Sequence, residues 1–125
     1  MAGTTSGVKI TQNAGDINII LYQGKTVNFE VIWGGAAPID VTGFSAKLQA
    51  RKAAASVSPM VTFQSPSSGI TVGGVNGKFI ISMSATNTAL LVADTGIYDL
   101  EITDGSGNVF QVMSGKFKIE AEATR

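Results

Sequence analysis

The chain of 125 residues contains neither cysteine nor histidine. Without cysteine it has no disulfide bond and no thiolate ligand for a metal ion. Without histidine it lacks the commonest general base, the commonest metal ligand and the side chain whose charge most often changes near neutral pH. Many hydrolytic and metal-dependent sites are built from these two residue types. We therefore expect a protein that is not an enzyme and that holds no metal ion or cofactor.

Charged residues are also scarce, at 14% of the chain, and the formal net charge is zero. A chain without excess positive charge has little to attract the phosphates of nucleic acid or anionic lipid. No apolar run approaches the roughly 20 residues that cross a bilayer, and residues 1–7 lack the basic and apolar regions of a secretory signal. We expect a soluble chain, made in the cytoplasm, with neither nucleic acid nor a membrane as a partner.

What the sequence does contain is alternation of apolar and polar residues, which is typical of half-buried β-strands. The alternation is clearest from residue 25 to residue 33, and similar segments lie at residues 17–22, 44–51, 60–63, 70–72, 78–83, 98–103 and 109–121. Residues 84–91 favour a short helical turn capped by Ser84. No long amphipathic helix is indicated, and the pattern predicts an all-β sandwich.

The last segment, residues 109–121, changes parity along its length. Phe110 and Val112 have the opposite parity to Phe117 and Ile119. One extra residue in a strand produces such a change, so the pattern predicts a β-bulge, which we place at Gly115.

The chain shows no break in composition, which favours one domain. We divide it into an N-terminal arm at residues 1–16, a sandwich at residues 17–121 and a C-terminal tail at residues 122–125. The arm begins with glycine, threonine and serine, so we expect it to be flexible or ordered only by a partner. Val8 and Ile10 alternate with polar residues within it, and such a segment can add to the open sheet edge of a neighbouring protein.

The most specific motif is Asp94-x-Gly96-x-Tyr98, which leads directly into a predicted strand. This is the sequence form of a tyrosine corner, in which the tyrosine hydroxyl bonds the backbone a few residues upstream and holds a Greek-key crossing. The motif favours an immunoglobulin-like Greek-key β-sandwich. The alternative is a simple Asp-Thr-Gly turn followed by an ordinary strand tyrosine.

Patterns that carry chemistry are weak. Asp99 and Glu101 share one strand face at a spacing that a two-carboxylate glycosidase could use, but we assign them to a solvated strand face. Asp104 and Asn108 could offer oxygen ligands to a cation, although these residue types are also common in hairpin turns. Basic residues come closest to a patch at Lys47, Arg51 and Lys52, without interleaved aromatic residues. We assign no catalytic, cofactor-binding or metal-binding residue.

Two apolar residues have the parity of the solvent face of their strands. Ile32 and Ile80 alternate with residues that we assign to the core. Outward apolar side chains on a sheet can mark a partner surface, although single exposed apolar residues are ordinary. We take Ile32, Ile80, Val8 and Ile10 as candidate interface residues.

The order of several motifs gives the chain a resemblance to a known group. The motifs are Gln23-Gly24-Lys25-Thr26-Val27-Asn28-Phe29, Trp33, the segment from Pro38-Ile39-Asp40-Val41-Thr42-Gly43 to Arg51, Ser68-Gly69-Ile70-Thr71-Val72-Gly73-Gly74 and Gly96-Ile97-Tyr98-Asp99-Leu100-Glu101-Ile102. Over residues 17–120 the chain resembles small immunoglobulin-like tail and baseplate proteins of tailed bacteriophages and prophages, and the N-terminal module of upper baseplate proteins. Leu100 stands where antibody-type domains have a cysteine, and Trp33 follows its strand too closely to be their core tryptophan.

The resemblance implies a non-enzymatic structural protein of the virion, in the tail, the baseplate or a fibre attachment. Its implied partners are other virion proteins and copies of itself. A capsid decoration or head-fibre protein is a second reading of the same fold. A module that binds host-surface glycan is a third, for which Tyr22 and Trp33 are the aromatic candidates.

Overall fold

The computed structural model describes residues 8–13, 16–33, 39–65, 69–73 and 77–121. In these ranges almost all regular structure is β. The elements in chain order are β1 (Val8–Asn13), β2 (Asp16–Tyr22), β3 (Val27–Ile32), β4 (Ser45–Arg51), β5 (Val61–Gln64), β6 (Ile70–Val72), β7 (Lys78–Met83), α1 (Ala85–Thr88), β8 (Asp94–Thr103) and β9 (Val109–Glu120). No helix in the described part of the chain is long and apolar enough to span a membrane.

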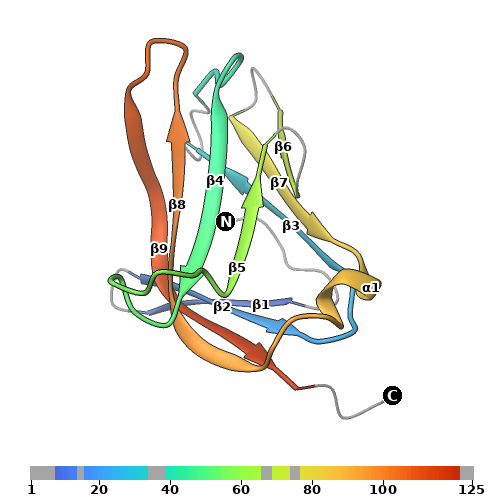
Figure 1. Cartoon of the computed structure of the whole chain (residues 1–125). Helices are drawn as coiled ribbons and strands as arrows, with labels where there is room; N and C mark the ends of the chain where they lie inside the picture. Colours follow the sequence, from blue (N-terminus) through green and yellow to red (C-terminus); the bar gives the residue numbers. More distant parts are fainter. Residues whose placement is uncertain (1–7, 14–15, 34–38, 66–68, 74–76, 122–125) are drawn as a thin grey trace.

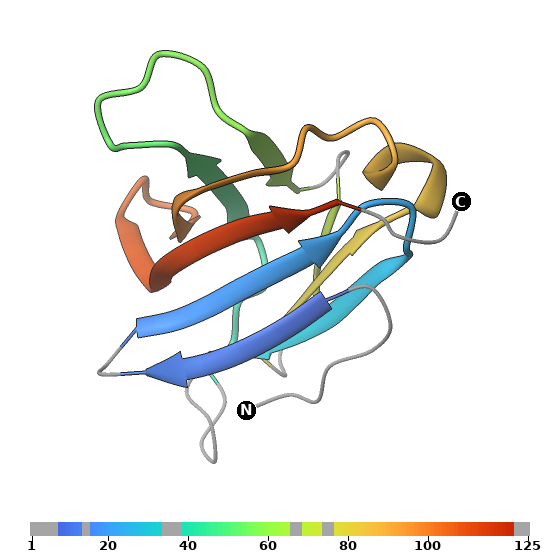
Figure 2. The same ribbon diagram turned by 90° about the horizontal axis from the view of Figure 1, so that it is seen from below.

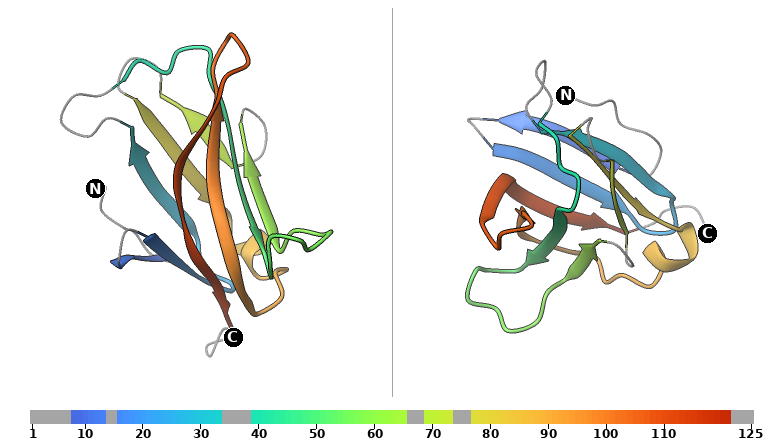
Figure 3. Two further views of the ribbon diagram at one scale, coloured as in Figure 1. Left: turned by 90° about the vertical axis from the view of Figure 1, so that its left-hand side faces the viewer. Right: turned by 90° about the horizontal axis from the view of Figure 1, so that it is seen from above.

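The strands form two sheets that face each other (Figures 1 and 3). The larger has the order β1-β2-β9-β8-β4-β5, and the smaller has the order β3-β7-β6. Strands β2 and β9 run parallel, whereas the other pairs are antiparallel. The prediction of an all-β chain is confirmed, and the two facing sheets have the character of a β-sandwich.

The core lies between the sheets and is built by the alternation that the sequence shows. In β4, Ala46, Leu48 and Ala50 are buried, while the residues between them are exposed or half-buried. Phe63, Phe79 and Phe117 are among the largest fully buried side chains, alongside Ile19, Leu21, Ile70, Ile81, Leu100, Ile102 and Ile119. Each fully buried aliphatic or aromatic side chain contributes about 1.5–3 kcal/mol through removal of its surface from water.

The fold has two opposite ends, and strands β4, β8 and β9 run from one to the other. One end, which we call the lysine end, carries residues 23–26, 52–60 and 89–94 together with α1. The opposite end, which we call the aromatic end, carries Trp33, residues 39–44 and the β8–β9 hairpin (Figures 1 and 3). The predicted cap of α1 is confirmed, because the Ser84 hydroxyl accepts a hydrogen bond from the Asn87 amide at 3.2 Å.

The expectation of a partner-ordered arm over residues 1–16 is wrong for its second half. Residues 8–13 form β1, which pairs antiparallel with β2 of the same chain, from Val8 opposite Leu21 to Asn13 opposite Asp16. Figure 2 shows β1 at the edge of the larger sheet, beside β3 of the smaller one. Only two residues separate β1 from β2, so pairing within the chain costs little loop-closure entropy. Residues 1–7, 14–15 and 122–125 lie outside the described ranges.

The predicted bulge exists, but three residues before the expected position. Leu100 pairs with Met113 and Glu101 pairs with Gln111, so Val112 is the extra residue of β9. Gly115 is in regular register opposite Tyr98. Parity alone indicates that a residue has been inserted between Phe110 and Phe117 but does not say where.

Candidate interaction surface

Tyr98 is buried as predicted, but its hydrogen bond is not that of a tyrosine corner. Its hydroxyl donates to the main-chain carbonyl of Ile17 on β2, which is 81 residues away in sequence. Residues 94–96 already belong to β8, so the backbone upstream of Tyr98 is extended and runs away from the ring. The corner formed by Asp94, Gly96 and Tyr98 is therefore replaced by a link across the larger sheet.

The link passes over Gly115, which lies on β9 between Tyr98 and β2. A Cβ atom at Gly115 would collide with the carbonyl of Ile17 and would lie 3.1 Å from Oδ1 of Asn18. At the same place the Lys116 amide donates to Asn18 Oδ1 at 3.0 Å. Side-chain hydrogen bonds thus join β2 to its neighbours before the regular β2–β9 pairing begins at Ile19.

Removal of the Tyr98 hydroxyl should destabilise the fold. We expect Tyr98→Phe to lower the free energy of unfolding by about 1–2 kcal/mol, because the Ile17 carbonyl loses its buried donor. Burial raises the pKa of the Tyr98 hydroxyl, with a smaller contribution from the negative charge of Asp16, so the group remains a donor at neutral pH. Urea denaturation measures the effect. Tyr22→Phe on the same protein is the matched control, and equal midpoints for the two variants would contradict the role of Tyr98.

Gly96 and Asp94, the other two residues of the motif, make contacts that do not involve Tyr98. A Cβ atom at Gly96 would collide with the Arg51 carbonyl and lie 2.7 Å from Sδ of Met60, so glycine lets the end of β4 and the residue before β5 pack closely against β8. Asp94 accepts a hydrogen bond from the Thr95 amide at 2.8 Å and forms an ion pair with Lys52 at 3.1 Å. These two contacts hold the pKa of Asp94 below its ordinary value.

The candidate interface residues fall on two different surfaces. Ile32 and Ile80 lie together on the outer face of the smaller sheet, where Ile32 pairs with Lys78 and Ile80 pairs with Glu30. The Lys78–Glu30 ion pair at 3.5 Å crosses between them, and Ile32 is 39% exposed while Ile80 is half-buried. Val8 and Ile10 instead belong to β1, at the edge of the larger sheet. The four residues do not form one patch.

A larger set of exposed apolar residues, which sequence analysis missed, lies mostly at the two ends. At the lysine end it comprises Val57, Leu90 and Val92, at the aromatic end Ile39, Val109 and Phe110, and on the outer face of the larger sheet Ile97. The sequence signal for this set is the apolar run from Leu90 to Val92, which overlaps the helical turn predicted over residues 84–91.

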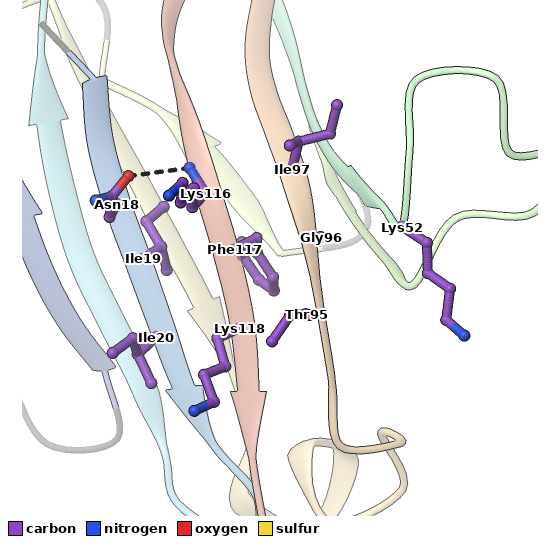
Figure 4. Close-up of a pocket in the computed structure, with 10 residues that line it drawn as sticks. All are labelled: Asn18, Ile19, Ile20, Lys52, Thr95, Gly96, Ile97, Lys116, Phe117 and Lys118. Carbon is purple, nitrogen blue, oxygen red and sulfur yellow. Dashed lines mark hydrogen bonds between the residues drawn. The ribbon is translucent and has the colours of Figure 1, made fainter.

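One pocket lies on the outer face of β2, β9 and β8 (Figure 4). It has a volume of about 440 Å³, with Ile19 and Phe117 in its floor and Lys52, Lys116 and Lys118 around it. Lys52 and Lys118 are paired with Asp94 and Glu120. None of the lining residues is a carboxylate, so the pocket offers no acid–base pair.

The residues considered for glycosidase or cation chemistry lie on polar surface. Asp99 and Glu101 lie on the outer face of β8, opposite Gln49 and Lys47. Asp104 is engaged by its own hairpin: its carboxylate accepts from the amides of Ser106 and Asn108 at 2.9 Å and from the Asn108 side chain at 3.0 Å. Within the described part of the chain, no three acidic residues gather as a metal site would require.

The two aromatic candidates for a glycan site lie at opposite ends of β3. Tyr22 precedes the turn into β3 and Trp33 follows its last residue. Trp33 packs instead against Phe44 and Phe110, with ring centroids 6.1 and 5.6 Å away. The two rings therefore cannot stack on one sugar. Neither a protein-family model nor a curated protein matches this sequence in the comparisons made with it.

Proposed function

We propose that this chain is a non-enzymatic structural protein of a bacteriophage virion, in the tail, baseplate or a fibre attachment, and that it acts by docking to other virion proteins. The observation that carries the docking role is the set of apolar side chains that the β-fold leaves exposed to solvent. Exposed apolar groups gathered on a rigid surface are the usual mark of a protein interface. The virion assignment rests on the order of sequence motifs given above.

We further propose that the sandwich is immunoglobulin-like with Greek-key connections. In that fold strands B, E and D share one sheet, and G, F and C share the other, which an added C′ strand can extend. Taking β3 to β9 in chain order as B, C, C′, D, E, F and G gives sheets B-E-D and G-F-C-C′, which matches the observed order. Tyr98 then lies on strand F, where a tyrosine corner is found in that family.

The outer face of the smaller sheet is the docking surface that this proposal favours. We expect the double variant Ile32→Ser/Ile80→Ser to be incorporated into virions about tenfold less than the wild type, because two apolar anchors are lost from the interface. Its melting temperature should change little, since neither residue is in the buried core. Ile97→Ser, a similarly exposed position on the larger sheet, is the matched control. Immunoblots of purified particles give the incorporated amount.

Labelled virions test the assignment itself. Gold-labelled antibody against the chain should mark the tail or its tip in electron micrographs of purified particles. Label on the head would favour the capsid decoration or head-fibre reading. Particles without label, or deletion mutants that assemble complete tails and infect normally, would overturn the tail role.

A further inference from the structure

The larger sheet holds the first and the last strand of the fold at the same level. β1 is its edge strand, β2 lies next to β1, and β9 lies on the other side of β2 (Figure 2). Leu21 of β2 pairs with Val8 of β1 on one side and with Ile119 of β9 on the other. The places where the chain enters and leaves this sheet are therefore two strand spacings apart, which is about 10 Å.

Tension applied between these two places acts first on β1. Its direction lies across the strands, because Val8 and Glu120 are separated along them by only one residue, or about 3 Å. In the ladders of the larger sheet β1 pairs only with β2, whereas β9 is held by both β2 and β8. A force across the antiparallel β1–β2 pair opens its hydrogen bonds one after another, from Val8 towards Asn13. We therefore expect β1 to peel away at low force.

Release of β1 changes the direction of the load. The tension then enters the sheet at Asp16, whereas Glu120 pairs with Tyr22 at the other end of β2. The seven residues of β2 span about 20 Å of strand, but β2 and β9 are only about 5 Å apart. The force thus runs nearly along the strands. Because β2 and β9 are parallel, a pull on the start of one and the end of the other slides them past each other.

Sliding of β2 against β9 loads many hydrogen bonds together. The bonds of a parallel ladder are evenly spaced, so the four regular pairs of β2 and β9 share the force. Further bonds extend this ladder at both ends. After β2, the Gln23 amide donates to the Glu120 carbonyl at 3.0 Å. Before the ladder begins, the Lys116 amide donates to Oδ1 of Asn18 at 3.0 Å.

Tyr98 fastens β2 to a third strand. Its hydroxyl donates to the Ile17 carbonyl, one residue from Asp16, where the load enters. Tyr98 belongs to β8, and every residue of β8 from Asp94 to Thr103 pairs with β9. Sliding of β2 must therefore break the Tyr98 bond at the same time as the β2–β9 ladder.

We infer that this fold is a two-stage mechanical clamp for tension applied between residues 8 and 120. In the first stage β1 is released as an extensible lead. In the second stage the β2–β9 pair and the Tyr98 bond carry the load in shear. A fold of this kind can connect two structures that are pulled apart without unfolding. The inference rests on strand order and register and holds whether or not the chain belongs to a virion.

Optical tweezers with handles on the two termini of the full chain test both stages. A first event at low force should lengthen the tether by about 3 nm, the extended length of residues 8–15. A second event at higher force should release residues 16–120, which extend to about 35 nm. Rupture of the whole fold in one step, without the short first event, would show that β1 is not a separate stage and would overturn the inference.

A change of pulling direction is the first control. The chain has no cysteine, so Val92→Cys supplies a single attachment site, and this exposed position should leave the melting temperature close to the wild type. Handles at residue 92 and the C-terminus pull on adjacent ends of antiparallel strands, where Asp94 of β8 pairs with Ile119 of β9. The sheet then opens bond by bond. Its rupture force should be at least about twofold lower than with terminal handles, since forced unfolding follows the barrier along the pulled direction. Equal forces would contradict the clamp.

A pair of variants separates the clamp from overall stability. Tyr98→Phe removes the bond to Ile17, and Ser65→Ala removes a bond of similar kind near the opposite edge of the larger sheet, where the Ser65 hydroxyl accepts from the Ala46 amide at 2.9 Å. Urea denaturation compares their equilibrium stabilities. With terminal handles at constant force, Tyr98→Phe should shorten the lifetime of the second stage about tenfold. Ser65→Ala should leave it unchanged, and an equal shortening in both variants would refute a load-bearing role for Tyr98.

Discussion

Deletion of residues 1–13 should lower the melting temperature of the isolated chain on the order of 10 °C. The deletion removes β1, whose six residues pair in unbroken register with β2. Each lost ladder hydrogen bond contributes about 0.5–1.5 kcal/mol. The deletion also turns β2, which is buried at Ile19 and Leu21, into the edge of the larger sheet. Differential scanning calorimetry measures the loss.

A shorter truncation that lacks only residues 1–7 is the matched control, and the difference between the two melting temperatures isolates β1. The composition of the N-terminal segment led us to expect a partner-ordered arm, and that hypothesis predicts the same melting temperature for both truncations. Equal values would therefore show that β1 contributes nothing in solution. A newly exposed β2 edge should also make the longer truncation prone to aggregate.

Gly115→Val should strongly destabilise the larger sheet. The new Cβ would collide with the Ile17 carbonyl, and β2 would have to move away from β9. That movement also breaks the hydrogen bonds of the Ile17 carbonyl with Tyr98 and of Asn18 with the Lys116 amide. Overpacking of this kind costs about 1–3 kcal/mol, to which the loss of these bonds adds. We expect a total loss on the order of 3 kcal/mol in urea denaturation.

Gly105→Ala is the control, because it adds a Cβ atom to a glycine where space is free. Nothing lies within 4 Å of a Cβ atom at Gly105, which is in the β8–β9 hairpin. Its stability should stay within about 0.5 kcal/mol of the wild type. A second comparison uses Tyr98→Phe. If Gly115→Val acts partly by breaking the hydrogen bond of Tyr98, the double variant should lose less stability than the sum of the two single losses.

The strands could be predicted from the sequence because period-two alternation is a local property. Residues 27–32 and 45–51 bury the side chains that their parity assigns to the core, and Ile32 and Ile80 face away from it. The helical turn capped by Ser84 is equally local, since the cap and the amide it binds are three residues apart. Each of these depends on neighbours within a few positions.

Which strands pair with each other was harder to predict, because pairing depends on segments that are far apart in the sequence. The alternation from Val8 to Thr11 identified a strand but not whether it pairs with this chain or another, and the two-residue link to β2 decided it. The parity change in β9 showed that a residue had been inserted, but its position depends on the register against β8. The motif around Tyr98 indicated a buried tyrosine but not that its hydroxyl donates to the Ile17 carbonyl.

The sequence by itself therefore determined the β class, the core faces of the strands and the lack of cysteine or histidine chemistry. Only the tertiary structure decided that Tyr98 reaches Ile17 across Gly115, because three strands from distant parts of the chain must first lie side by side. It also decided where exposed apolar side chains gather. Val57 and Leu90 lie in segments without periodicity, and they share one end because β4, β5 and β8 place their connecting loops together. Exposure depends on what the rest of the chain covers, and no local pattern contains that information.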